Sequence, residues 1–375
     1  MNYVLEVPPR IVTGWGTIST IGSEVSTIGE RVMVIHTKRL VNSSLIEEIL
    51  LDLKNHGVYV ICEHVSSGEP TVEQVEMVLK KVEEQNCDFV IGVGGGSVLD
   101  LAKAVAGLKF PNRKPVKDYF YGEKIPQKGI PWVAVPTTSG TGSEVTPNSV
   151  LSDEKNVKLS IRGDNSWLAK VVILDPQLTV SSPANVTAWS GMDALTQAVE
   201  AHTSKGANAL TEPYSLKATT LIANSLMVAY KHPEDQKART DMALGSLLAG
   251  VALANARLGI VHGVAHSIGL HFNVPHGLVC GTLLPWAIEY NQDVSRDKYQ
   301  EIAQANGVGT SASDLENWVR TINMELGIPY SIKEFGVAKK DLDRIVEESM
   351  PSGSLKANPR TTSREELYEF LAKQL

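Results

Sequence analysis

Strand-like and helix-like segments alternate through the first half of this chain, and that alternation narrows the folds open to it. Short apolar runs rich in valine and isoleucine occupy residues 31–36, 58–63 and 88–94, as in buried strands. Between them, residues 43–55 and 73–86 have the composition of helices. Because a helical crossover joins strands that run in the same direction, the sequence predicts a parallel sheet covered by helices.

The pattern changes near residue 180. Beyond this point, long helical segments follow one another, separated by breakers such as Pro233 and Pro329, and almost no strand pattern remains. A chain of 375 residues is long enough for two or three domains. We therefore predict an α/β domain over residues 1–180 and an all-α domain over residues 181–375.

A glycine-rich turn follows the third of these strands directly. Gly94, Gly95, Gly96 and Ser97 lead into a helical stretch at residues 98–108. Backbone N–H groups at a helix N-terminus bind phosphate, so this turn is a candidate phosphate site. Tight turns also need glycine for conformational reasons, and the spacing differs from the GxGxxG of standard dinucleotide-binding domains.

A second polar loop begins where another apolar strand ends. Residues 135–147 place five hydroxyl side chains around two glycines: Thr137, Thr138, Ser139, Thr141 and Ser143. Such a loop can simply be solvated. Open α/β sheets, however, bind ligands at the carboxyl ends of their strands, where both loops are predicted to lie. Two polar loops at that edge would suit a dinucleotide.

Histidines are concentrated in residues 258–285, which contain four of the nine in the chain: His262, His266, His271 and His276. His262 and His266 are one helical turn apart and share a face. His276 follows a break at Pro275, so a turn is expected to present it. Each histidine alone could be a core residue bonded to the backbone. As a cluster, they favour a metal or catalytic site, because neutral imidazole is a common metal ligand.

A carboxylate would complete such a site, and Asp193 is the best candidate. It lies near the start of the first predicted helix of the all-α domain, and Gln197 shares its face one turn later. Asp193 could instead favour the helix N-terminus through the helix dipole. His202 is nine residues past Asp193 and is expected to point the other way.

The composition argues against several classes of function. A formal net charge of −7, without any lysine- or arginine-rich block, argues against a nucleic-acid partner. No apolar run reaches the length that spans a membrane, and the N-terminus lacks the pattern of a signal peptide. The three cysteines, Cys62, Cys87 and Cys280, form neither a disulfide framework nor a CxxC motif. These features predict a cytoplasmic protein without a membrane partner.

Over essentially its full length the sequence resembles the iron-dependent (group III) alcohol dehydrogenase family. The motifs that carry the resemblance occupy residues 94–106, 135–147, 191–204, 259–285 and 358–360. The resemblance implies a Rossmann-like nucleotide-binding domain followed by an all-helical metal-binding domain, an arrangement like that of dehydroquinate synthase. It implies NAD(P)-dependent interconversion of alcohols with aldehydes or ketones, usually with Fe²⁺ and sometimes with Zn²⁺, in a homo-oligomer, for which a homodimer is the default symmetric choice.

The resemblance also implies roles for individual residues. The metal positions match Asp193, His262 and His276, and a nearby position that serves proton traffic matches His266. Asp100 matches a polar residue near the nicotinamide. The remaining cofactor positions match the two polar loops, where the pyrophosphate and adenosine portions bind: Gly94, Gly95, Gly96, Ser97, Thr137, Thr138, Thr141 and Ser143.

Three positions depart from the family pattern. Gln197 stands where a fourth ligand, histidine, is usual, and its neutral carbonyl oxygen is a weaker donor than imidazole. Thr37 stands where NAD-preferring members carry aspartate, and Lys38 and Arg39 follow it, so a preference for NADP is expected. Arg257 stands where many members carry a small residue, and it could bind an acidic substrate, face solvent or form an ion pair.

Two other functions fit parts of this pattern. A lyase of the dehydroquinate synthase type would need a basic site for a phosphate-bearing substrate, but residues 258–285 contain no lysine or arginine. A nucleotide-binding protein whose metal site has decayed at Gln197 would not be expected to keep the aspartate and the histidine cluster. The sequence thus favours a metal-dependent oxidoreductase that transfers a hydride between NAD(P)(H) and an alcohol/aldehyde pair.

Overall fold

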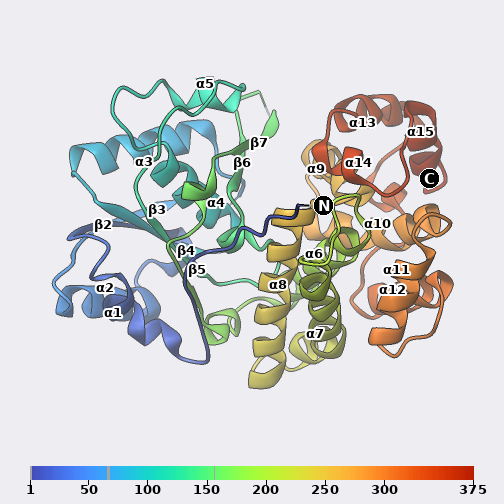
Figure 1. Cartoon of the computed structure of the whole chain (residues 1–375), viewed down its shortest axis with the longest axis horizontal. Coiled ribbons are helices and arrows are strands. Elements are labelled where there is room, and N and C mark those ends of the chain that lie inside the picture. Colours follow the sequence, from blue (N-terminus) through green and yellow to red (C-terminus); the bar gives the residue numbers. More distant parts are fainter. Residues whose placement is uncertain (1, 66–67, 156) are drawn as a thin grey trace. The chain divides into compact units, whose positions relative to one another are not determined.

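The structure, a computed structural model of the chain, describes residues 2–65, 68–155 and 157–375 (Figure 1). The chain forms two compact units. One, the α/β unit, comprises Glu6–Thr138 and Ser143–Val180. The other, the helical unit, comprises Ser181–Leu375, the short segment Ser139–Gly142 and the N-terminal residues up to Leu5.

The α/β unit is built on a six-stranded parallel sheet, which confirms the predicted fold class. The strand order is β1-β8-β5-β4-β2-β3. The strands are β1 (Ile11–Thr13), β2 (Arg31–Thr37), β3 (Tyr59–Val65), β4 (Phe89–Gly94), β5 (Trp132–Pro136) and β8 (Val171–Leu174). Central strands β4 and β5 are buried along their whole length, and a strand covered on both faces is therefore a continuous apolar run.

Helices lie on both faces of this sheet, with α1 and α2 on one side and α3 and α4 on the other (Figure 1). Their bounds are α1 (Ile21–Val25), α2 (Ser44–Asn55), α3 (Val72–Glu84), α4 (Gly96–Gly107) and α5 (Val116–Phe120). Helix α3 begins with a capping box, in which Thr71 and Gln74 satisfy each other's backbone N–H groups. An antiparallel pair, β6 (Asn148–Ser152) and β7 (Lys158–Arg162), also belongs to this unit and was not predicted.

Three neighbouring strands end at the same edge of the sheet. His36 pairs with Val93, and Gly94 pairs with Pro136, so β2, β4 and β5 finish in one row. The backbone N–H of Thr137 donates to the carbonyl of Gly94 at 2.9 Å. This row places the end of β2, the glycine turn and the first threonines of the second loop along one carboxyl edge, where parallel sheets bind ligands.

The helical unit contains no strand among its described residues. Its longer helices are α6 (Ala184–Thr203), α7 (Glu212–Lys231), α8 (Gln236–Ala256), α9 (Ile260–Phe272), α10 (His276–Asn291), α11 (Arg296–Ala305) and α12 (Ala312–Glu325). Three shorter helices follow, α13 (Leu342–Ser349), α14 (Gly353–Ala357) and α15 (Arg364–Ala372). In the described chain, no single helix has both the length and the hydropathy of a membrane span; only α8 and α9 taken together, with a bend of 106°, reach them.

Helix α10 is central to the helical unit. Its Leu284 and Ile288 pack in a core with α6, α7, α8, α11 and α12, whereas Val279 and Leu283 pack in a second core with α9, α13 and α15. A helix that is buried on both sides has apolar residues on all its faces. This explains why the part of α10 that ends the histidine-rich segment has no polar face. The first turn of α10 is thereby held rigidly between α6 and α9.

Candidate metal centre and cofactor loops

Four side chains from three helices converge inside the helical unit. Asp193 comes from α6, His262 from α9, and His276 and Cys280 from the first two turns of α10. One donor atom from each lies within 4.8 Å of the donor atoms of the other three. Asp193, His262 and Cys280 are buried, and His276 is partly exposed. This cluster, which we call the donor cluster, has the residue types and the compactness of a metal centre.

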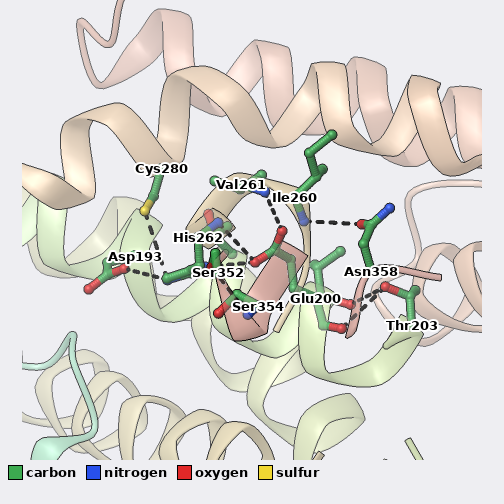
Figure 2. A network of polar contacts seen from close by, with 12 residues as sticks. Asp193, Glu200, Thr203, Ile260, Val261, His262, Cys280, Ser352, Ser354 and Asn358 are labelled. Atoms are coloured by element: carbon green, nitrogen blue, oxygen red, sulfur yellow. Dashed lines mark hydrogen bonds and ion pairs between the residues drawn. The ribbon is translucent and has the colours of Figure 1, made fainter. Parts of the chain in front are cut away.

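The distances within the donor cluster are short and similar. Asp193 Oδ1 lies 3.3 Å from His262 Nε2 and 3.7 Å from His276 Nε2. Cys280 Sγ lies 3.5 Å from His276 Nε2 and 3.9 Å from His262 Nε2. Figure 2 shows Asp193 and Cys280 on one side of His262 and Glu200 on the other. Both histidines therefore direct Nε2 toward the same point as Asp193 and Cys280.

Glu200 fixes the ring of His262 from behind. This buried carboxylate lies two turns after Asp193 on α6 and accepts from His262 Nδ1 at 2.7 Å. It also accepts the backbone N–H of Val261 at 2.7 Å, at the start of α9 (Figure 2). A hydrogen-bonded Nδ1–H leaves Nε2 as the lone-pair donor, so Glu200 selects the tautomer of His262 that can bind a metal.

Asn358 completes the N-terminus of α9. Its Oδ1 accepts the backbone N–H of Ile260 at 3.1 Å. The side-chain amides of Asn358 and Asn291 also form two hydrogen bonds with each other, each donating from Nδ2 to the Oδ1 of the other. The first helical N–H groups have no partner within a helix, so Glu200 and Asn358 together satisfy them. Gly259 allows this approach, because a Cβ there would lie 2.8 Å from Glu200 Oε1.

A glycine also sets the closeness of α10 to α6. A Cβ at Gly277 would lie only 2.1 Å from the carbonyl oxygen of Trp189 and 3.3 Å from the Cβ of Asp193. No other residue fits there without a shift of backbone. The absence of a side chain at Gly277 is what allows His276 and Asp193, on neighbouring helices, to lie within reach of one cation.

The charges of the donor cluster are strongly coupled. Burial opposes ionisation of Asp193, but the facing His276 and His262 lower its pKa overall. Burial also opposes protonation of His262, yet Cys280, Asp193 and Glu200 raise its pKa well above the ordinary value. Burial raises the pKa of the Cys280 thiol to about 12. The anionic surroundings that favour an imidazolium equally favour a cation placed among these donors.

Gln197 lies one turn after Asp193 on the same face of α6 and is buried. Its Oε1 has no hydrogen-bond partner among the described residues. A buried amide oxygen without a partner is costly unless something outside the protein bonds it. This carbonyl oxygen is therefore available to a ligand beside the donor cluster.

Three further sequence candidates lie outside the donor cluster. His266, one turn after His262, stacks on His276 with ring centroids 5.0 Å apart. His271 instead bonds Glu348 of α13 at 2.8 Å, so it does not join the other histidines. Arg257 ends α8 with a φ of 70° and is exposed.

The glycine turn forms the start of α4. The helix begins at Gly96 with Gly95 as its N-cap, two residues earlier than predicted, so Gly96 and Ser97 are its first residues. A Cβ on Gly95 would lie only 3.2 Å from Thr138 Oγ1. The backbone of the glycine turn therefore lies close to the first residues of the second polar loop. The first N–H groups of a helix have no partner within the helix, so this helix start, next to a hydroxyl, is a favourable setting for a phosphate.

Asp100 and Ser143 are occupied by contacts inside the α/β unit. Asp100 accepts from Lys103 Nζ at 3.3 Å, from the Ser143 hydroxyl, and from the Val150 N–H at 2.8 Å. Lys103 is fully buried, and burial lowers its pKa although Asp100 opposes this. These bonds tie α4 to β6, which gives Asp100 a structural role in addition to any role near the cofactor.

The other cofactor candidates lie in different places. Thr37 ends β2, half-buried, with Lys38 and Arg39 exposed directly after it. Thr137 and Thr138 follow β5 and are also half-buried. Thr141 is exposed and falls in the short segment that belongs to the helical unit.

Sequence reasoning missed two residues of this centre. Cys280 is absent from the predicted ligands, although its spacing of four from His276 could have indicated it. Glu200 is spaced seven from Asp193, which also places it on the same face of α6. The predicted break before His276 is confirmed, because α9 ends at Phe272 and α10 begins at His276 with Pro275 as its N-cap.

Comparisons with known proteins agree with this geometry. The sequence profile described as iron-containing alcohol dehydrogenase matches residues 8–176, and the C-terminal profile of the Fe-containing alcohol dehydrogenase family matches residues 187–375. The chain is 31% identical to NAD-dependent methanol dehydrogenase of Bacillus methanolicus over 98% of this chain and 99% of that protein. It is 36% identical to long-chain-alcohol dehydrogenase 1 of Geobacillus thermodenitrificans, over 93% and 91%.

Solved structures give the same result. The crystal structure of a 1,3-propanediol oxidoreductase superposes with a TM-score of 0.95, at 32% sequence identity, over 100% of both chains. Both profiles together cover nearly the whole chain, and each falls largely on one of the two compact units. The chain belongs to the iron-containing alcohol dehydrogenase family.

Proposed function

We propose that this oxidoreductase interconverts an alcohol and its aldehyde or ketone with NAD(P)(H), using a divalent cation held by Asp193, His262 and His276. The observation that carries the proposal is the convergence of these donors on one point inside the helical unit. Two imidazole nitrogens and one carboxylate oxygen are a ligand set suited to Fe²⁺ and Zn²⁺. The buried Oε1 of Gln197, which has no hydrogen-bond partner in the described chain, adds a polar group beside it.

The chemistry divides between bound groups and protein groups. When bound, the cation supplies positive charge that stabilises a substrate oxygen as it loses or gains a proton. The nicotinamide supplies the hydride chemistry. The chain itself supplies position: Glu200 holds the Nδ1–H of His262 and so keeps its Nε2 directed at the cation.

His266 is our candidate for proton transfer. Its ring stacks on that of His276 with an interplanar angle of 18°, and it is partly exposed. Imidazole gains and loses a proton near neutral pH, so a partly exposed ring next to the donor cluster can accept the proton of a substrate hydroxyl and release it to water. Asp100 remains a candidate for orienting the nicotinamide, through α4.

The test is turnover by metal-loaded protein. Protein reconstituted with Fe²⁺ or Zn²⁺ is mixed with NADH or NADPH and a panel of aldehydes, and oxidation of the cofactor is followed by absorbance. We expect oxidation that stops when a chelator removes the metal and returns when metal is restored. No oxidation above background with either cofactor and either metal would contradict the proposed function.

We further propose that the chain accepts NADP(H) and prefers it to NAD(H). Thr37 carries no negative charge at the end of β2, and Lys38 is exposed next to it. A carboxylate at Thr37 would repel a ribose 2′-phosphate. The methanol dehydrogenase among its relatives is named NAD-dependent, so the preference is a point on which this chain would differ.

Replacing Thr37 by aspartate is expected to reverse this preference. A like-charge contact costs enough to lower kcat/KM for NADPH about 10–100-fold while leaving that for NADH within about threefold. The measurement is kcat/KM with each cofactor at a fixed aldehyde concentration. Thr37→Asn, which is neutral and of the same size as the aspartate, is the control and should keep the original ratio; an unchanged ratio in Thr37→Asp would place the 2′-phosphate elsewhere.

Two properties rest on the family resemblance and on general arguments. The three cysteines are all free thiols, which supports a reducing, cytoplasmic environment. A homodimer is our expectation for the assembly, since closed two-fold dimers are the commonest soluble oligomers.

A further inference from the structure

The geometry points to Cys280 as the fourth protein ligand of the metal centre. In this chain it would supply the bond that a histidine at position 197 makes in other members of the family. This inference rests on the proposed function and deepens it, because it concerns the donor set of the same site. Cys280 is fully buried on α10, one turn after His276, and its Sγ lies among the other donors. The family resemblance assigns no role to this position.

The distances fit one tetrahedral ion. In a tetrahedral zinc site with bonds of about 2.0–2.3 Å, oxygen and nitrogen donors lie about 3.4 Å apart, and sulfur and nitrogen donors about 3.6 Å apart. Asp193 Oδ1 lies 3.3 and 3.7 Å from the two imidazole nitrogens. Cys280 Sγ lies 3.5 and 3.9 Å from the same two nitrogens. All four of these donor–donor distances match the tetrahedral values within a few tenths of an ångström, without any movement of the helices.

The backbone holds Cys280 in this place. His276 and Cys280 are four residues apart on α10, so both side chains leave the same face of the helix. Gly277 brings this face against α6, and Gly281 packs against Met192 of α6 one turn further on. Cys280 packs in the same apolar core as its neighbours Val279 and Leu283 on α10, and it also has a donor atom within 4.8 Å of those of Asp193, His262 and His276.

Gln197 is the competing fourth ligand. Its Oε1 is buried and has no hydrogen-bond partner in the described chain, so it could also reach a cation. A neutral amide oxygen suits hard cations such as Mg²⁺ and Ca²⁺, whereas a cluster with two imidazoles suits softer ones. A thiolate is a far stronger donor to a first-row divalent metal than an amide oxygen is. We therefore assign the fourth bond to Cys280 and leave the Gln197 oxygen as an acceptor for a substrate or a water.

This assignment has a consequence for metal selectivity. Among the ligands alone, one carboxylate and one thiolate balance the charge of a divalent cation, whereas a set with Gln197 leaves one positive charge to be balanced by Glu200 behind His262. Thiolate ligands select Zn²⁺ over the harder divalent ions. The chain should therefore prefer Zn²⁺ to Fe²⁺ more strongly than a member of the family with an imidazole at position 197 and no cysteine at position 280.

The experiment uses Co²⁺ as a probe that reports its own ligands. Metal-free full-length protein is titrated with Co²⁺, and absorption is recorded in the near-ultraviolet and visible regions. We expect an intense thiolate-to-cobalt charge-transfer band and the visible bands of tetrahedral Co²⁺, both saturating at one equivalent. Cys280→Ser and Cys280→Ala should lose the charge-transfer band. Both variants should also bind Zn²⁺ more weakly, and the loss of affinity should exceed the roughly 10–100-fold that is typical when a residue hydrogen-bonded to a metal ligand is replaced.

Two control variants make the result specific. Cys62→Ser removes an exposed thiol on β3 and should leave the band unchanged. Gln197→Ala should also keep it. Circular dichroism of both Cys280 variants checks that the helical unit is folded. Agreement between the serine and alanine variants separates loss of the ligand from the effect of a hydroxyl in the core.

Each outcome decides between the proposals. Co²⁺ bound at one equivalent without a charge-transfer band in the wild type would overturn the role of Cys280 and leave the proposed function intact. A change of the visible bands in Gln197→Ala, with no change in Cys280→Ala, would assign the fourth bond to Gln197 instead. No binding of Co²⁺, Zn²⁺ or Fe²⁺ by the wild type would overturn the metal centre and the proposed function together.

Discussion

Replacing His262 by alanine should abolish both metal binding and turnover. The variant loses the imidazole whose Nε2 lies 3.3 Å from Asp193 Oδ1, and the Glu200 carboxylate keeps the backbone N–H groups of residues 261 and 262 as its donors in the described chain. A cation contributes several kcal/mol of transition-state stabilisation in such sites, so kcat/KM should fall by about 10³-fold or more. Metal content per chain, measured by elemental analysis, should fall with it.

The matched control is His271→Ala on the same helix. His271 bonds Glu348 and lies outside the donor cluster, so its loss should leave metal content unchanged and turnover within a few fold. Cofactor binding by the α/β unit should survive in both variants, which can be checked by NADPH fluorescence. Full metal content with normal turnover in His262→Ala would place the cation elsewhere in the chain.

The parallel sheet could be predicted because its signal is local. Strands buried on both faces are continuous apolar runs, and the predicted residues 88–94 nearly coincide with β4. The hairpin of β6 and β7 could not be predicted in the same way. Its strands mix polar and apolar residues, and Asp100 on α4 supports it by accepting the N–H of Val150. That support comes from a distant part of the chain and leaves no periodic pattern.

The metal site was only partly readable for a related reason. The concentration of histidines and the family motifs indicated Asp193, His262 and His276, which the fold brings together. The same pattern could not separate His271 from the others, because its partner Glu348 lies 77 residues further along the chain. The three cysteines form no disulfide framework and no CxxC motif, and the spacing of four between His276 and Cys280 indicates a shared face only if both residues lie on one helix.

Glu200 shows why outer residues are the hardest to predict. A glutamate on a helix is usually exposed, and only the packing of α9 against α6 buries this one beside His262. We expect Glu200→Gln to weaken metal binding about 10–100-fold, because the amide is a poorer acceptor for the Nδ1–H of His262 and makes its Nε2 less basic. The measurement is the Kd for Zn²⁺, obtained by competition with a chromogenic chelator.

The same substitution should also lower the stability of the metal-free protein. Glu200 accepts from His262 Nδ1 and from the N–H of Val261, and a glutamine offers only one oxygen to those donors. One buried donor is left unpaired, which typically costs about 1–3 kcal/mol in the free energy of unfolding. Asn358→Ala is the control, since it removes the acceptor of the Ile260 N–H at the same helix terminus without touching the imidazole. Urea unfolding should show comparable destabilisation in the two variants, whereas only Glu200→Gln should weaken Zn²⁺ binding; equal weakening in both would mean that Glu200 acts through the helix terminus and not through the ring of His262.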